Sequence, residues 1–175
     1  HRLQRLLCIR DSTLRELSAE AADGSVLSVA AGIDYVNWAR ERIAEGRTKA
    51  GRSDEHPVTV FALYAVDDDG DAARDSARET LAFYRQNGPN GLPDVYGISE
   101  ELSALIDQGG YDALVNGMPD QWVEDLTISG TPEECAAKIS AFHAAGADSV
   151  ALFPIATDRI GDIVRLTADT VLPDL

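Results

Sequence analysis

Residues 58–66 read Val-Thr-Val-Phe-Ala-Leu-Tyr-Ala-Val, an unbroken run of apolar, aromatic and β-branched residues. Such a run predicts a buried strand, and Pro57 just before it marks where the strand begins. Strands with no polar face occur in parallel sheets that helices cover on both sides. The segment therefore favours an α/β fold with a parallel sheet.

Three further apolar runs predict strands, at residues 5–9, 25–30 and 148–153. Between and after them, apolar residues recur at helical spacing, so strands and helices alternate along the chain. Four βα units in a row are half of an eight-stranded (β/α)8 barrel, and a small doubly wound sheet is the alternative. No Gly-x-Gly-x-x-Gly follows the first strand, which weakens the dinucleotide-binding version of that alternative.

The region between the third and fourth predicted strands is less regular. Residues 88–97 contain several glycines and prolines and predict an irregular segment. A helix is expected from Ile98 to Gln108, where two glycines end it, and a poorly defined segment follows. Thr131-Pro132-Glu133-Glu134 is a capping box with proline at the first helical position, and it predicts a helix that ends at Gly146.

The composition excludes several classes of protein. The 175 residues carry 30 Asp+Glu against 15 Lys+Arg, a formal net charge of -15, which argues against binding to nucleic acid. No apolar run approaches the length of a membrane span, so we expect no membrane partner. The cysteine content favours a reducing, cytoplasmic location. Two cysteines, Cys8 and Cys135, cannot form a disulfide framework, and we interpret both as buried thiols.

Other residues that suggest chemistry favour structural roles. The acidic run from Asp67 to Asp71 lacks the ligand spacing of a calcium loop and is interpreted as a solvated helix cap. None of His1, His56 and His143 has a histidine or cysteine at metal-ligand spacing, so we expect no metal site. No serine lies in a nucleophile elbow, which leaves hydrolysis without support.

Three segments resemble the bacterial-luciferase-like flavin and deazaflavin oxidoreductases. They are Leu14 to Val29, with Ala21-Ala22-Asp23-Gly24 between helix and strand; Gly130 to Ile139, which includes the capping box; and Ala144 to Pro154, at the last predicted strand. Their order and spacing cover nearly the whole chain. Within the family, the second segment and Phe153-Pro154 are more similar to the deazaflavin (coenzyme F420) branch than to the FMN monooxygenases.

The resemblance implies a (β/α)8 barrel of about twice this length. Residues 1–175 would then form a single domain, the C-terminal half of the barrel with units five to eight, and the N-terminal half would be absent from this sequence. The exposed sheet edges would be covered by self-association as a homo-oligomer or by that missing half. The chain begins with His1 rather than Met, which suggests that it is part of a longer protein.

The resemblance also implies an oxidoreductase that transfers a hydride between coenzyme F420 and a small organic substrate. An FMN-dependent monooxygenase and a non-catalytic half-barrel that acts as a binding or assembly module are the alternatives. The residues that contact the coenzyme ring are expected mostly in the missing half, so no catalytic residue is assigned.

A candidate phosphate site for the coenzyme follows the first predicted strand. Arg10 offers a bidentate cation there, and Ser12 and Thr13 offer hydroxyl and backbone N–H groups at a helix N-terminus. Asp11 adds a repelling charge to the same loop, which also departs from the glycine- and proline-rich form usual in the family. We therefore predict that residues 10–13 bind the coenzyme, with plain helix capping beside a surface arginine as the alternative. The loop from Pro154 to Asp158 is the next candidate for the phosphate.

Overall fold

The computed structural model describes residues 6–9, 22–87 and 95–175. Within these ranges the strands form one sheet in which every pairing is parallel. The strands are β1 (Leu6–Ile9), β2 (Gly24–Leu27), β3 (Val58–Val66), β4 (Ile128–Gly130) and β5 (Ser149–Pro154). The four predicted strands correspond to β1, β2, β3 and β5, and these neighbour one another in chain order. The predicted parallel arrangement is therefore confirmed.

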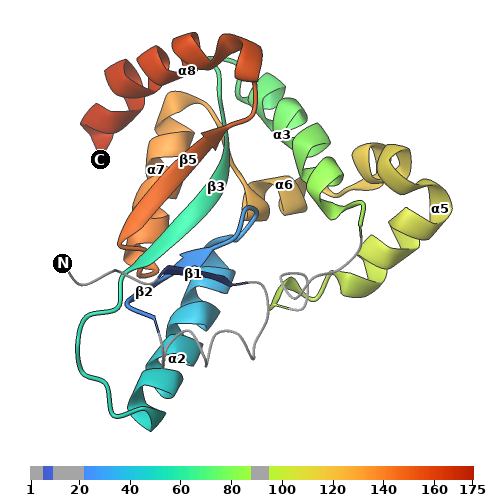
Figure 1. The fold of residues 1–175 in the computed structure, drawn as a ribbon. Coiled ribbons are helices and arrows are strands. Elements are labelled where there is room, and N and C mark those ends of the chain that lie inside the picture. The colour runs from blue at the N-terminus through green and yellow to red at the C-terminus, as the bar shows by residue number, and fades with distance from the viewer. Residues whose placement is uncertain (1–5, 10–21, 88–94) are drawn as a thin grey trace.

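Strand β3 is the centre of the sheet (Figure 1). Its first residues, 58–60, pair with β2, and its last residues, 64–66, pair with β4. Along residues 59–64 it also pairs with β5. The longest apolar run of the sequence thus becomes the strand with the most neighbours, which gives the backbone N–H and C=O groups of this largely buried strand partners along its length.

The structure corrects two predictions about strands. Strand β2 ends at Leu27 rather than at residue 30, because Ala30 takes a positive φ of 63°, which an extended strand cannot accommodate. Strand β4 was not predicted at all. It has only three residues, and its pairing with Val66 arises from the tertiary fold.

The helices of the described residues follow the predicted alternation. They are α2 (Ile33–Lys49), α3 (Gly70–Arg85), α5 (Ser99–Gly117), α6 (Asp120–Leu126), α7 (Pro132–Ala144) and α8 (Ile160–Leu166), with short turns η1 (Thr157–Arg159), η2 (Thr167–Val171) and η3 (Leu172–Asp174) around α8. The capping box of α7 is confirmed, because the Thr131 side chain accepts from Glu134 N–H while Glu134 accepts from Thr131 N–H.

The segment between β3 and β4 is more helical than the sequence predicted. Gly109 and Gly110 break α5 as expected, with non-helical backbone angles at both positions. The chain then continues as a second helical stretch to Gly117 and as α6, where a poorly defined segment was expected. Tertiary packing explains the difference, since Leu114, Trp122 and Val123 are buried against α3.

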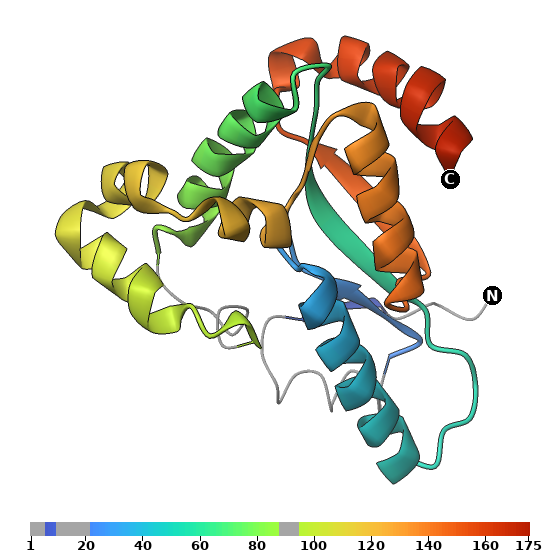
Figure 2. The same cartoon turned by 180° about the vertical axis from the view of Figure 1, so that it is seen from behind.

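The two faces of the sheet are covered unequally. Figure 2 shows α2 and α7 lying across one face. On the opposite face, onto which Figure 1 looks, Leu63 and Ala65 at the carboxyl half of β3 are buried in a cluster with α3. Val60 and Ala62 pack into the core beneath α2 and α7, whereas Phe61, which alternates with them, is 39% exposed. Phe153 on β5 is 38% exposed, and its ring lies 6.5 Å from that of Phe61. Two aromatic rings therefore meet on an exposed part of the sheet.

Among the described residues, no helix has both the length and the apolar character needed to cross a membrane.

Candidate functional site at the carboxyl edge of the sheet

In parallel α/β folds, functional residues lie in the loops that follow the carboxyl ends of the strands. The described connections of this kind are residues 28–32 after β2, 67–69 after β3, Thr131 after β4 and 155–156 after β5. The predicted phosphate-binding residues Arg10, Asp11, Ser12 and Thr13 lie outside the described residues. Their assignment therefore stays a prediction. They directly follow β1, which ends at Ile9 and runs parallel to β2.

The loop after β2 is held in a strained conformation. Ala30 is fully buried and has left-handed backbone angles, which cost a residue with a Cβ about 1–2 kcal/mol. The guanidinium of Arg85, which is 3% exposed, donates to the Ala30 carbonyl oxygen at 3.4 Å. A cationic side chain from α3 therefore reaches the carboxyl edge of the neighbouring β2. Strain of this kind persists only where the surroundings fix it, and it clusters at ligand sites.

The start of α2 belongs to the same loop. Gly32 is the N-cap of α2 and has no side chain with which to cap the helix. The hydroxyl of Tyr96, from the segment between β3 and β4, accepts the Tyr35 N–H at 3.3 Å instead. Burial raises the pKa of Tyr96, so the group stays a neutral hydroxyl.

A second cationic residue lies across the edge. Arg159, after β5, forms an ion pair of 3.3 Å with Asp67, after β3. Asp67 also accepts the N–H of Asp69, and this hydrogen bond together with Arg159 lowers the pKa of the Asp67 carboxyl. Arg159 is 58% exposed, which leaves much of its guanidinium open to a ligand.

The acidic run after β3 is a helix cap, as predicted. Asp69 is the N-cap of α3, and its side chain accepts the N–H groups of Asp71 and Ala72 at 3.1 and 3.2 Å. In the described part of the chain, no three histidine, cysteine or acidic side chains are grouped so that they could hold a metal ion. Cys135 is fully buried, and burial raises its pKa to about 12, which makes it an inert thiol at neutral pH.

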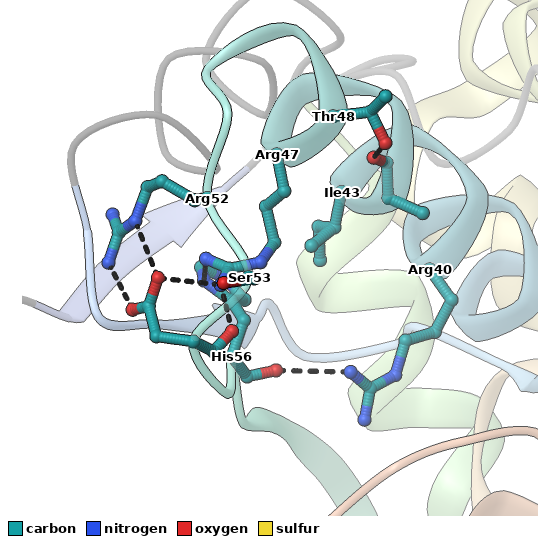
Figure 3. Close-up of a pocket in the computed structure, with 9 residues that line it drawn as sticks. Arg40, Ile43, Arg47, Thr48, Arg52, Ser53 and His56 are labelled. Carbon is teal, nitrogen blue, oxygen red and sulfur yellow. Dashed lines mark hydrogen bonds and ion pairs between the residues drawn. The ribbon is translucent and has the colours of Figure 1, made fainter.

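A cavity of about 500 Å³ lies at the opposite, amino edge of the sheet, between α2 and the loop that leads into β3 (Figure 3). It is lined by three arginines, Arg40, Arg47 and Arg52, and by His56. The sequence analysis considered His56 but did not single out these arginines, because they form no recognised ligand-binding motif.

The arginines around this cavity are engaged with the protein itself. Arg52 pairs with Asp54 at 2.7 Å, and Arg47 pairs with the same carboxylate at 3.0 Å (Figure 3). Arg40 pairs with Asp148 at 2.5 Å and donates to the carbonyl of Gly146 at 2.6 Å. The carboxylates compensate the local positive charge, so these arginines fasten the loops before β3 and β5. In barrels, the amino edge generally contributes stability rather than catalysis.

Comparison with known proteins identifies the family. Residues 10–149 match the model of the luciferase-like monooxygenase family. A 5,10-methylenetetrahydromethanopterin reductase of Archaeoglobus fulgidus is 29% identical over 170 residues, which are 91% of this chain and 51% of the reductase. The chain thus spans about half the length of the curated relatives it matches.

Solved structures show the same fold. The coenzyme F420-dependent tetrahydromethanopterin reductase from Methanopyrus kandleri superposes with a TM-score of 0.78 at 22% identity, over 96% of this chain and 50% of the reductase. The FMN-bound oxygenating constituent of 3,6-diketocamphane monooxygenase from Pseudomonas putida superposes with a TM-score of 0.60 at 17% identity, over 96% of this chain and 47% of that protein. The predicted half-barrel fold is therefore confirmed, and this chain belongs to the luciferase-like monooxygenase family.

Proposed function

We propose that this chain is part of an oxidoreductase that transfers a hydride between coenzyme F420 and a small organic substrate. The observation that carries the proposal is the similarity, over 91% of the chain, to a methylenetetrahydromethanopterin reductase. The closer superposition on an F420-dependent reductase than on an FMN-bound monooxygenase, with TM-scores of 0.78 and 0.60, also favours the deazaflavin.

The carboxyl edge of the sheet suits an anionic coenzyme. Although the chain has a net charge of -15, the end of α3 brings Arg85 to this edge and the short turn η1 brings the exposed Arg159. Arg10 would add a third cation after β1. When bound, the coenzyme supplies the ring that carries the hydride, and the protein contributes binding, orientation and electrostatics.

The exposed area of the sheet around Phe61 and Phe153 supports a second proposal, which concerns the rest of the barrel. We propose that residues 1–175 are units five to eight of a barrel and that four further βα units pack against Phe61 and Phe153. The relatives are about twice as long as this chain, which provides the length for those units. Barrel closure would also pair the edges of β1 and β5 that no described strand pairs.

Titration of coenzyme F420 and, separately, of FMN into the full-length protein tests the function. We expect F420 to bind more tightly and to be reduced or oxidised in the presence of substrate. Tight binding of FMN alone would favour a monooxygenase, and binding of neither coenzyme would favour a non-catalytic module.

Replacement of Arg10 tests the predicted phosphate site. Arg10→Ala in the full-length protein should weaken F420 binding by about 1.5–3 kcal/mol, the usual value for a hydrogen bond to a charged group. Arg165→Ala is the matched control, because it removes the same charge from a side chain that is 73% exposed on α8. Unchanged affinity in Arg10→Ala would favour the loop from Pro154 to Asp158 as the phosphate site. Arg159→Ala, at the residue that directly follows that loop, would then be the decisive variant.

A further inference from the structure

Helix α2 begins at the carboxyl edge without a capping side chain of its own. The first N–H groups of a helix have no partner within the helix, and a side-chain oxygen or an anionic ligand usually accepts them. At α2 the acceptor for Tyr35 N–H is the Tyr96 hydroxyl, 61 residues further along the chain. A group from the segment between β3 and β4 therefore occupies a helix start that could otherwise have faced a ligand.

The contact is tight enough to fix the loop. A Cβ at Gly32 would lie 2.4 Å from the Tyr96 hydroxyl and 2.1 Å from the Asp125 carbonyl oxygen, so only glycine fits between them. On the other side of the loop, Arg85 donates to the carbonyl of Ala30. Tyr96, Asp125 and Arg85 all belong to the chain between β3 and β4, and together they enclose residues 30–32.

We propose that Tyr96 is a positioning residue for the coenzyme site, which it shapes by holding the loop after β2. This inference rests on the proposed function, because it takes the carboxyl edge as the place where F420 binds. The Tyr96 hydroxyl accepts the Tyr35 N–H in the first turn of α2 and packs against Gly32, so the loop presents a fixed backbone surface before the coenzyme arrives. A preformed loop lowers the entropic cost of binding, and the effect belongs to affinity rather than to hydride transfer.

The test compares Tyr96→Phe with the wild type in the full-length protein. The variant keeps the ring and removes only the hydroxyl. We expect the Kd and the KM for F420 to rise roughly 2- to 10-fold, the range of one net hydrogen bond, while kcat stays unchanged. Tyr111→Phe is the matched control, since Tyr111 lies on α5 with 37% of its surface exposed, and it should leave both constants unchanged.

The possible outcomes separate the inference from the proposed function. A lower thermal midpoint for Tyr96→Phe with unchanged Kd and KM would show a merely structural cap and overturn the inference. An equal change in Tyr111→Phe would overturn it as well. If the wild type binds FMN rather than F420, the proposed coenzyme is wrong, and the same comparison made with FMN decides the role of Tyr96. If the wild type binds neither coenzyme, both proposals are overturned.

Discussion

At the scale of single residues, two buried positions have properties that reduce the stability of the fold under some conditions. Ala30 adopts a left-handed backbone at the carboxyl edge, and His56 is buried beside arginines at the amino edge. Neither property can be inferred from the neighbouring sequence, because both arise from contacts with distant segments. Each position yields a prediction about stability.

Ala30→Gly should stabilise the protein. Glycine adopts positive φ without the clash that alanine suffers, and this relief outweighs its greater freedom in the unfolded chain by up to about 1 kcal/mol. Ala31→Gly is the control, since Ala31 is equally buried but is not among the described residues with positive φ. Urea unfolding should show a gain for the first variant and a loss for the second. A loss in both would contradict the assignment of strain to Ala30.

His56 makes stability depend on pH. Arg47 donates to its Nδ1 at 3.4 Å, so Nε2 carries the proton and donates to Ser25 Oγ at 2.8 Å. Burial, with Arg47, Arg52 and Arg40 nearby, lowers the pKa of His56 and outweighs the opposite effect of Asp54. The unfolded chain then binds a proton more readily than the folded one.

The free energy of unfolding is therefore not reduced by His56 above about pH 6.5, the unfolded pKa of histidine. It falls as the pH drops toward the lower folded pKa, by at most about 1.4 kcal/mol per pH unit. Urea unfolding of the wild type and of His56→Gln between pH 7.5 and 5 measures the difference. Parallel pH profiles for the two proteins would refute the role of His56.

At the scale of elements, local signals predicted what local physics determines. The capping box of α7 and the strand at residues 58–66 were identified because their determinants lie within a few residues of one another. Strand β4, the cap of α2 by Tyr96 and the arginines of the amino edge were missed. Strand β4, the cap of α2 and Arg40 depend on partners about 60 or more residues away, such as Tyr64 for β4 and Asp148 for Arg40. Arg47 and Arg52 pair with the nearby Asp54, but these residues form no recognised motif. The predicted site at residues 10–13 stays untested, since it lies outside the described residues.

The capping box of α7 gives a prediction at this scale. Thr131→Ala should lower the free energy of unfolding by about 1 kcal/mol, because it leaves the Glu134 N–H without its acceptor. Thr48→Ala is the control, since the Thr48 hydroxyl bonds only to a carbonyl of its own helix, α2. Chemical denaturation should show a clear loss for Thr131→Ala and a change within about 0.5 kcal/mol for Thr48→Ala. Equal losses would mean that the box adds nothing to α7.

At the scale of the whole molecule, no described helix covers the sheet face around Phe61 and Phe153. Each of Phe61 and Phe153 leaves more than a third of its surface exposed. For two aromatic rings of typical size, covering this area would stabilise the covered state by on the order of 4 kcal/mol. The 175-residue chain alone should therefore associate with itself and bind an apolar dye.

Sedimentation of this chain should give a species heavier than the 18.8 kDa of one copy. The double variant Phe61→Ser, Phe153→Ser should reduce both association and dye binding. Phe83→Ser removes a ring that is 60% exposed on α3 and should change neither. A stable monomer without dye binding would show that the face needs no partner.

The central position of β3 also has a consequence for biosynthesis. Thr59 on β3 and Ser149 on β5 are partners separated by 90 residues. At a synthesis rate of about 5–20 residues per second, β3 emerges from the ribosome roughly 5–20 s before β5 can join it. During that interval the edge of β3 that later pairs with β5 is exposed to other chains. The strand that organises the finished sheet is thus the segment most in need of protection by chaperones while the chain is still being made.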